Sequence, residues 1–255
     1  MARIRAVIFD LDGTVYNGAE EVPGVSRFVK RLIERRIRYL FVTNRASRRP
    51  DAVARQLRGF GIPCTRDNIL TSAQATALVL RKGKAFIIGQ AGLRSALQER
   101  GFTLTDRSPD YMIASFDTRL TYAKLARACQ LIEGGAKFVA TNMDKRLKTE
   151  TGFIPGTGAI VAALTTATGV TPLVIGKPEK LLVTLGLRRM KVRASEALLV
   201  GDNVETDVPA GVRAGVRTAL LLGGVSTRAD ARRRRPRPTW VVESYERLWA
   251  IVRRL

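Results

Sequence analysis

Four short polar segments, far apart in the chain, contain residue types that together could transfer a phosphoryl group. They are residues 10–14 (DLDGT), 43–44 (TN), 177–178 (KP) and 201–207 (GDNVETD). Each lies at the end of, or just after, a run expected to be a buried β-strand. Because ligands bind outside the carboxyl ends of the strands in an open α/β sheet, the four segments are predicted to meet. Three carboxylates, a hydroxyl, an amide and an ammonium group would then suit metal-assisted phosphoryl transfer through an aspartate nucleophile.

The first segment carries two carboxylates with one residue between them. If the backbone stays extended, the side chains of Asp10 and Asp12 point the same way, and Gly13 then allows a sharp turn. One carboxylate could attack a phosphoryl group while the other supplies and removes a proton. Taken alone, the segment is equally compatible with a turn at a strand end. A calcium loop would need further acidic positions downstream, which are absent.

The other three segments supply groups that could bind phosphate and metal. Thr43 and Asn44 could hold phosphate oxygens, and Lys177 would offer them a point charge. Asp202 offers a carboxylate to a hard cation such as Mg²⁺. Asp207 could orient that site or cap the helix that follows it. Each residue alone has a simpler explanation as part of a turn or as a solvated side chain, so the combination carries the prediction.

Short apolar runs alternate with amphipathic stretches along the chain, which predicts an α/β fold with a doubly wound parallel sheet. Strands are expected at 5–9, 39–42, 84–88, 111–116, 137–140, 173–175, 197–200 and 217–222. Helices are expected from Pro23 onward and at 50–60, 93–100, 122–132, 158–168 and the C-terminus. The residues expected on the buried faces of two of these helices are Val25, Phe28, Val29, Leu32 and Ile33, and Tyr122, Leu125, Ala126, Cys129 and Ile132.

The four chemical segments leave a long middle stretch without motifs of their kind. We therefore expect an inserted α/β domain at residues 78–175, and a core catalytic domain formed by residues 1–77 and 176–255. The N-terminus enters a strand almost at once, and no apolar run is long enough to span a bilayer. A cytoplasmic protein without membrane association is the expectation.

The composition excludes several kinds of chemistry. The chain has 255 residues and no histidine, which excludes His-based triads, His-zinc sites and imidazole acid–base catalysis. Its two cysteines, Cys64 and Cys129, are expected to be buried thiols rather than a disulfide, which fits a reducing cytosol.

The charge is strongly one-sided, with 44 basic and 22 acidic residues and a net charge of +22. This excess is compatible with a general basic bias, with anionic small substrates or with nucleic acid, although no recognised nucleic-acid-binding module is present. The basic run Arg232–Arg235 is expected to be an exposed loop.

With all four segments present in this order, the sequence resembles the haloacid dehalogenase superfamily of phosphatases over nearly its whole length. The place, length and α/β pattern of the insertion resemble the type IIA cap of the NagD-like, or 4-nitrophenylphosphatase-like, family. Further segments that match this subgroup are 42–44 (VTN), 140–144 (ATNMD), 149–152 (TETG), 155–158 (PGTG), 176–178 (GKP) and 201–207 (GDNVETD).

The resemblance implies a mechanism and a set of roles. Asp10 would be the nucleophile that forms an aspartyl-phosphate, and Asp12 would be the general acid and base. Mg²⁺ would be held by Asp10, the backbone carbonyl of Asp12, and Asp202. Asp207 would orient this site without binding the metal directly. The residues that would bind the phosphoryl group are Thr43, Asn44 and Lys177. Since relatives that cleave carbon–halogen bonds typically lack the acid at position 12, its presence favours phosphate esters.

The expected substrates are therefore small phosphomonoesters such as nucleotides, sugar phosphates or phosphoglycolate. Arg45 stands where the subgroup commonly has Asn, and it is expected to alter substrate preference; Asp117 lies where the subgroup's cap faces the active site. A polyanion-binding protein on the same fold is the alternative. A phosphotransferase or a phosphonate hydrolase would be a third, the latter using a cap lysine such as Lys124 or Lys137. Relatives of this subgroup often pair through their caps, so the resemblance implies a homodimer formed through the cap, although the sequence itself gives no oligomeric state.

Overall fold

The computed structural model describes residues 3–149 and 151–255, which divide into two compact units. Unit 1 consists of Met1–Thr43, Asp51–Leu70 and Lys177–Leu255, and unit 2 consists of Asn44–Pro50 and Thr71–Gly176. The segment predicted as an inserted domain, residues 78–175, lies inside unit 2. This unit also includes the short stretches that precede the segment.

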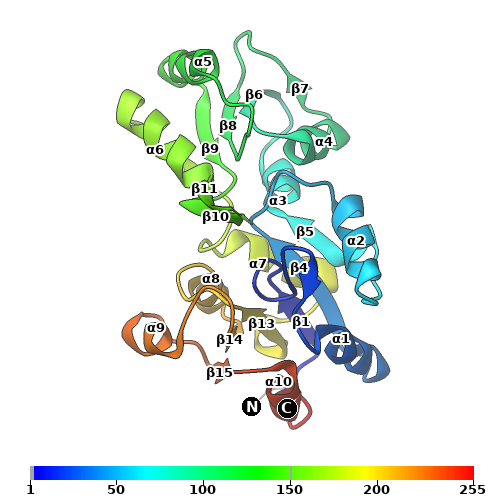
Figure 1. Cartoon of the computed structure of the whole chain (residues 1–255). Helices are drawn as coiled ribbons and strands as arrows, with labels where there is room; N and C mark the ends of the chain where they lie inside the picture. Colours follow the sequence, from blue (N-terminus) through cyan, green and yellow to red (C-terminus); the bar gives the residue numbers. More distant parts are fainter. Residues whose placement is uncertain (1–2, 150) are drawn as a thin grey trace. The chain divides into compact units, whose positions relative to one another are not determined.

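Unit 1 is built on a six-stranded sheet. Its strands are β1 (Ala6–Phe9), β4 (Arg38–Thr43), β5 (Ile69–Thr71), β13 (Ala197–Gly201), β14 (Arg217–Leu221) and β15 (Trp240–Val242). They lie in the order β15-β14-β13-β1-β4-β5, and β1 pairs in parallel with β13 on one side and with β4 on the other (Figure 1). The chain order reverses at β1. The carboxyl end of β1 is therefore the switch point at which open α/β sheets bind ligands.

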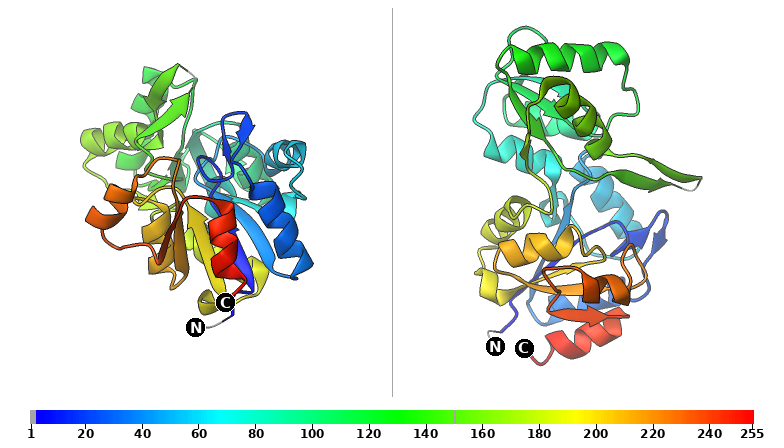
Figure 2. Two further views of the ribbon diagram at one scale, coloured as in Figure 1. Left: turned by 60° about the horizontal axis from the view of Figure 1, so that its bottom comes forward. Right: turned by 90° about the vertical axis from the view of Figure 1, so that its left-hand side faces the viewer.

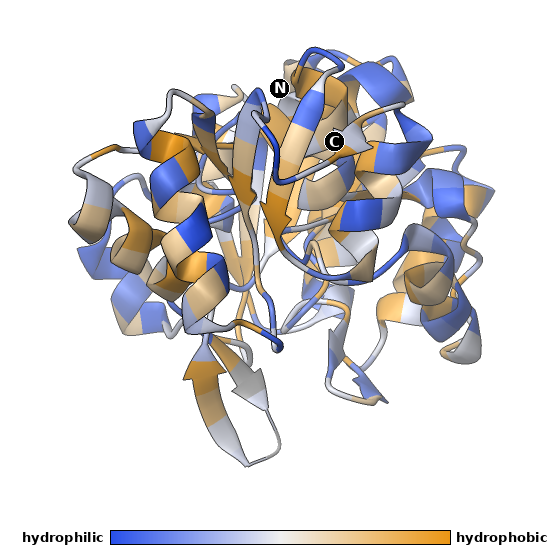
Figure 3. Cartoon of the chain, turned by 90° about the horizontal axis from the view of Figure 1, so that it is seen from above, coloured by the Kyte–Doolittle hydropathy of each residue, from blue (hydrophilic) through white to orange (hydrophobic). Residues whose placement is uncertain are grey.

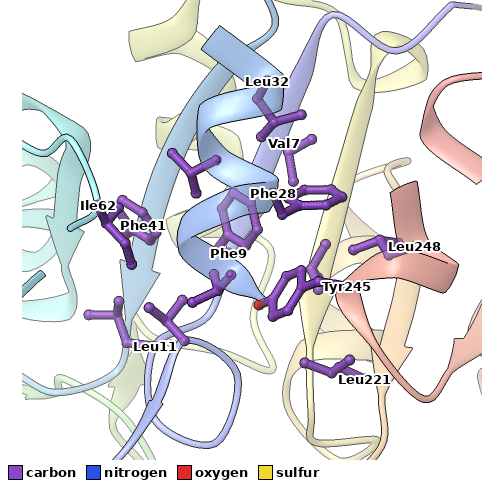
Figure 4. Close-up of a cluster of buried hydrophobic side chains, with 14 of the residues drawn as sticks. Val7, Phe9, Leu11, Phe28, Leu32, Phe41, Ile62, Leu221, Tyr245 and Leu248 are labelled. Atoms are coloured by element: carbon purple, nitrogen blue, oxygen red, sulfur yellow. The ribbon is translucent and has the colours of Figure 1, made fainter. Parts of the chain in front are cut away.

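Helices cover both faces of this sheet. They are α1 (Val25–Glu34), α2 (Pro50–Gly59), α7 (Leu181–Met190), α8 (Asp207–Arg213), α9 (Arg228–Arg233) and α10 (Tyr245–Val252), with short 3-10 turns at Arg66–Asn68 and Ala194–Glu196 and a small hairpin, β2 (Tyr16–Asn17) and β3 (Glu20–Glu21). On one face, Phe9 meets Phe28 of α1 edge to face at 5.9 Å, and Tyr245 of α10 packs against both rings (Figure 4). On the other, Gly186 lets α7 approach closely, because a Cβ there would lie 2.9 Å from Leu40.

Unit 2 has a parallel sheet of its own. Its strands are β6 (Lys84–Ile88), β7 (Thr103–Leu104), β8 (Tyr111–Ala114), β9 (Lys137–Ala140) and β12 (Leu173–Val174), in the order β12-β9-β8-β6-β7. Its helices are α3 (Ser72–Val79), α4 (Ala91–Glu99), α5 (Tyr122–Glu133) and α6 (Thr157–Thr168). Helices α5 and α6 bury one face through side chains such as Ile132 and Leu164, which join Met112 and Phe138 in a single apolar cluster.

An antiparallel hairpin formed by β10 (Arg146–Thr149) and β11 (Gly152–Pro155) stands out from the sheet of unit 2 (Figure 2). The apolar residues concentrate in the strands and on the inner helix faces, and the outer helix faces are polar (Figure 3). The two parallel sheets flanked by helices confirm the predicted α/β class.

Two residues that were predicted to be buried, Ile33 and Tyr122, are exposed. Ile33 is 43% exposed, because the buried stripe of α1 ends with Leu32 and the next position lies at its edge. Tyr122 is 87% exposed. The buried face of α5 is centred on Ala128, which lies roughly 120° around the helix from Tyr122.

The predictions for the cysteines and the arginine run hold in part. Both cysteines are free thiols, as expected, but Cys64 is buried and Cys129 is only half-buried. The run Arg232–Arg235 is exposed, as predicted, but its first two residues belong to a helix rather than to a loop. The reason is a capping box in which Thr227 and Asp230 satisfy the first backbone N–H groups of α9.

No helix formed by residues 3–149 or 151–255 combines the length and the apolar character that crossing a membrane requires.

Candidate active site

Three neighbouring strands of unit 1 end beside one another and present polar groups at the same edge. Phe9 of β1 is in register with Val200 of β13 and with Phe41 of β4. Asp10 directly follows Phe9. On the neighbouring strands, Thr43 lies two residues after Phe41, and Asp202 lies two residues after Val200. Asp10, Thr43 and Asp202 are all buried, although most of the strand residues before them are apolar.

Lys177 lies at the centre of a buried charge cluster. Its ammonium group forms ion pairs with Asp10 Oδ1 and with Asp207 Oδ1, the latter at 2.6 Å. The second oxygen of Asp207 accepts the backbone N–H of Asn203 at 3.1 Å, which fixes the carboxylate at the start of α8. The Lys177 side chain is only 3% exposed. Its position is thus determined by two carboxylates from two different elements.

Asp202 is enclosed by glycines and backbone groups. The N–H of Val225 donates to its Oδ2 at 2.6 Å, and the hydroxyl of Thr14 donates to its Oδ1 at 3.4 Å. A Cβ at Gly13 would lie 2.3 Å from this carboxylate, and one at Gly224 would lie 2.1 Å from it. Only glycine fits at either position, so the two loops close on Asp202 because they lack side chains there.

The last helix also supports this edge of the sheet. The hydroxyl of Tyr245, from α10, donates to the backbone carbonyl of Thr14 at 2.8 Å, and burial raises the pKa of this phenol well above its usual range. The loop that follows Asp10 is therefore held both by Asp202 and by a residue near the C-terminus.

Burial dominates the acid–base properties of two carboxyl groups in the cluster, Asp10 and Asp202. It raises the pKa of Asp10 well above its ordinary value, more than the attraction of Lys177 lowers it. Burial, with repulsion from Asp207, raises the pKa of Asp202 to about 6. Burial alone would lower the pKa of Lys177, but attraction to Asp10 and Asp207 outweighs it and raises that pKa. The positive charge of Lys177 is thus insufficient to offset the effect of burial on Asp10 and Asp202, while Lys177 itself stays protonated.

The donor set fits a divalent cation. Oxygen atoms of Asp10, Asp202 and Asp207 all lie within 4.8 Å of one another. When all three carboxyl groups are ionised, they exceed the single ammonium by two negative charges in a buried volume, which a divalent ion would neutralise. Hard carboxylate oxygens are the ligands that Mg²⁺ prefers. Asp207 accepts hydrogen bonds at both oxygens, from Lys177 and from Asn203. Asp10 binds Lys177 through Oδ1, and the contact of Asp202 Oδ1 with Thr14 is long, at 3.4 Å, so these two residues are the better first ligands.

Asp12 follows the cluster on the loop after β1. It is exposed and forms a β-bridge with Tyr16, so it lies where solvent and a ligand can reach it. A turn begins immediately after Asp12, where Gly13 has a φ of 84°. This is the left-handed region, which glycine adopts without strain.

Asn44 falls in unit 2, although the preceding residue, Thr43, belongs to unit 1. Its amide donates to Asp144 Oδ1 at 3.0 Å, and its backbone carbonyl accepts hydrogen bonds from Ser72 and Asn142. Gly176 is again required by packing, because a Cβ there would lie 2.5 Å from Asn44 Oδ1. Asn44 is thus fixed within unit 2, at the point where the chain enters it.

The two residues expected to influence substrate choice also lie in unit 2. Arg45 is exposed. The Asp117 side chain is 3% exposed and pairs with Lys124 at 2.8 Å, and its other oxygen accepts the backbone N–H of Arg119. Asp117 is therefore a structured residue of its loop rather than a solvated one. Lys124 is held by Asp117 and by the carbonyl of Arg119.

Sequence reasoning missed Gly224 and the N–H of Val225. Both follow β14, so a fourth strand end contributes to the site. The signal was a Gly-Gly pair directly after an apolar strand, which by itself is indistinguishable from an ordinary turn.

Comparison with known proteins agrees with this geometry. Residues 7–103 match a family model described as haloacid dehalogenase-like hydrolase, and residues 174–248 match a second, HAD-hydrolase-like model. The 5'-nucleotidase YutF of Bacillus subtilis (strain 168) is 39% identical over 248 residues, which cover 96% of this chain and 97% of that protein. The chain belongs to the haloacid dehalogenase-like hydrolases.

Other members of this family give the same result. An acid sugar phosphatase of Staphylococcus saprophyticus is 35% identical, with 94% of this chain and 95% of that protein covered. The crystal structure of 4-nitrophenylphosphatase from Thermotoga maritima has a TM-score of 0.93 and 31% identity, covering 98% and 97% of the two chains. NagD from Escherichia coli K-12 has a TM-score of 0.90 and 31% identity, covering 96% and 98%. Within its family the chain is thus a NagD-like phosphoric monoester hydrolase.

Proposed function

We propose that this hydrolase cleaves small phosphomonoesters with Mg²⁺ through a covalent phosphate ester of Asp10. The observation that carries the proposal is the buried cluster of Asp10, Lys177, Asp202 and Asp207 at the carboxyl ends of β1 and β13. Such a cluster is costly to bury, and a structural role alone gives no reason for its excess of negative charge.

Asp10 acts as the nucleophile. Its Oδ1 is held by Lys177, which leaves Oδ2 to attack the phosphorus atom of the substrate. The bond from phosphorus to the ester oxygen breaks, and the leaving alcohol takes a proton from Asp12. Asp12, now a carboxylate, removes a proton from water, which attacks the phosphorus atom and releases inorganic phosphate from Asp10. The exposed position of Asp12 suits this exchange of protons with substrate and solvent.

The carboxylates of Asp10 and Asp202 and the backbone carbonyl of Asp12 would hold the cation. When bound, Mg²⁺ neutralises charge on the phosphoryl oxygens and reduces their repulsion from Asp10.

Three further residues bind the phosphoryl group. The hydroxyl of Thr43, the amide of Asn44 and the ammonium of Lys177 provide donors to its oxygens. Asp207 acts through Lys177, because it holds the ammonium group in place. Residues 78–175 serve as a cap that restricts the site to small molecules.

The substrate class rests on relatives and on Arg45. The named relatives include a 5'-nucleotidase and an acid sugar phosphatase, so nucleoside monophosphates and sugar phosphates are the first candidates. The exposed guanidinium of Arg45 adds positive charge beside Asn44, which favours substrates with further anionic groups. Relative rates for wild type and Arg45→Asn across the panel test this role, and an unchanged ranking would contradict it.

The decisive experiment measures phosphate release from a panel of phosphomonoesters, with Mg²⁺ and with EDTA, for wild type and Asp10→Asn. We expect turnover only with the metal and only in the wild type. Acid-quenched enzyme should carry phosphate in the wild type and, with slower release, in Asp12→Asn. Turnover by folded Asp10→Asn at the wild-type rate would exclude the covalent intermediate on Asp10. Turnover retained in EDTA would exclude only the requirement for a divalent cation.

The alternative of polyanion binding rests on the net charge of +22, and salt-dependent binding of RNA by Asp10→Asn would support it. Location in the cytoplasm and pairing through the cap stay predictions.

A further inference from the structure

A second basic site lies in unit 2, at the amino ends of its strands. A hollow of about 680 Å³ opens there, between the segment that leads into β6, the first residues of β8 and β9, and the end of α5. Its volume falls within the range of about 300–1,000 Å³ that is usual for sites of small ligands. None of the residues predicted to act in catalysis or phosphate binding lines it.

The lining of the hollow is strongly basic. Its lining residues include four basic side chains, Arg81, Lys82, Arg127 and Lys137, and one acid, Asp110. One oxygen of Asp110 accepts the backbone N–H of Lys84 at 2.7 Å, so this carboxylate is engaged by the strand itself. Within residues 3–149 and 151–255, no ion pair is formed by Arg81, Lys82 or Lys137. The lining thus carries four basic residues against one acid, and this excess of positive charge favours an anionic occupant.

Two other residues give the hollow a defined shape. The guanidinium of Arg127 donates to the carbonyl of Asp106 and, at 3.2 Å, to Gln130, so it is positioned before any ligand arrives. The ring of Tyr111 packs against Phe102, with 6.2 Å between their centroids, and is 8% exposed in the wall of the hollow. Because the Arg127 guanidinium is already held, it loses little entropy on binding a ligand.

The hollow and the Asp117 loop lie at opposite ends of the same strand. Tyr111 is the first residue of β8, and Asp117 follows three residues after its last. At about 3.3 Å per residue, the strand alone separates its two ends by roughly 10 Å, and Asp117 lies beyond its carboxyl end. An occupant of the hollow is therefore a ligand bound beside the sheet of unit 2 and not a substrate at that loop.

We propose that this hollow binds a small polyanion with two or more linked phosphoryl groups, in the size range from pyrophosphate to a nucleoside triphosphate. Several separated cations match an anion whose charges are spread along a short chain better than they match a single phosphate. The proposal does not depend on the chemistry at Asp10.

The test is calorimetric titration of the full chain with pyrophosphate in EDTA. Lys82→Gln/Lys137→Gln removes two charges from the hollow, and Arg94→Gln/Arg100→Gln removes two charges from exposed positions of unit 2 outside it. We expect the first variant to bind on the order of tenfold more weakly or worse, the usual effect of losing a hydrogen bond to a charged group. The second should bind like the wild type. Equal weakening of both variants, or no saturable binding to the wild type, would overturn the proposal.

Amide hydrogen exchange of the wild type with and without pyrophosphate provides a measurement that needs no variant. Protection at residues 81–84 and 127–137 supports the site. Protection confined to the segments around Asp10 and Lys177 would mean that pyrophosphate occupies only the catalytic cluster, and the proposal would be wrong.

Discussion

At the scale of single residues, the two hydrogen-bond partners of Asp207 indicate a specific role for it in the site. One oxygen of its carboxylate holds the ammonium of Lys177 and the other holds the backbone of Asn203. The residue therefore connects the start of α8 to the charge cluster. A cap for α8 alone would not require the contact with Lys177.

Replacing Asp207 with Asn should lower kcat by about 10- to 100-fold, as is usual for residues that orient catalytic ligands. The amide keeps the shape of the carboxylate but attracts the Lys177 ammonium less strongly, so that group becomes mobile. Steady-state kinetics measure the change, and Glu205→Gln, an exposed acid near the same helix, is the control. If kcat is unchanged and only thermal stability falls, Asp207 has a purely structural role.

Glu196 gives a pH dependence of stability that is separate from catalysis. Hydrogen bonds from the Arg193 side chain and backbone lower its pKa from 4.5 to about 2. A lowered pKa contributes stability that is fully present above pH 4.5. This contribution is lost as the pH falls from about 4.5 towards 2, because protonation breaks the contacts with Arg193.

We therefore expect the free energy of unfolding of Glu196→Gln to fall less steeply than that of the wild type between pH 4.5 and about 2. Urea unfolding monitored by circular dichroism measures both curves, with Glu133→Gln as a matched exposed control. Parallel wild-type and Glu196→Gln curves through this window would count against the assignment.

At the scale of elements, the loops that close on Asp202 depend on missing side chains. Gly13 and Gly18 both have positive φ angles, of 84° and 61°. A Cβ at Gly13 would collide with Asp202, whereas one at Gly18 would meet nothing within 4 Å. Substitutions at Gly13 and Gly18 can therefore distinguish the effect of backbone strain, which both would have, from displacement of Asp202, which only Gly13 would cause.

Gly13→Ala and Gly18→Ala should each lose stability, by roughly 1–2 kcal/mol from left-handed strain. Only Gly13→Ala should also lose Mg²⁺ affinity and turnover, because its methyl group displaces the Asp202 carboxylate. Thermal melts with increasing Mg²⁺ measure metal binding without relying on activity. Similar Mg²⁺ stabilisation of the two variants would show that the Asp202 contact is unimportant.

The same scale shows what sequence patterns can and cannot predict. The strands leading to Asp10 and Asp202 are short apolar runs that end in charge, so both the strands and their grouping at one edge were predictable. The hairpin β10–β11 was not, because its strands carry few apolar residues and lack alternation. The contribution of Gly224 was hidden because a close approach between loops leaves no periodic pattern. The division between Thr43 and Asn44 was equally hidden, since it depends on packing partners distant in sequence.

At the scale of the whole molecule, the net charge of +22 should affect how substrates arrive. Phosphomonoesters are doubly anionic near neutral pH, and a positive field raises their local concentration at low salt. We expect KM for such esters to rise as the salt concentration increases, while kcat at saturation stays constant. Rates measured in a series of NaCl concentrations test this expectation. A KM that does not respond to salt would mean that the charge lies away from the substrate's route.

The discontinuity of unit 1 has a consequence for the making of the protein. Strand β1 pairs with both β4 and β13, but β13 begins only at Ala197, after all of unit 2 has been translated. At ordinary rates of synthesis the ribosome needs on the order of ten seconds to cover this stretch. During that interval one side of β1 has no strand partner, and its backbone groups and apolar side chains are open to other chains. The nascent chain is therefore expected to depend most on chaperones before β13 emerges, and to lose that dependence once this strand has paired with β1.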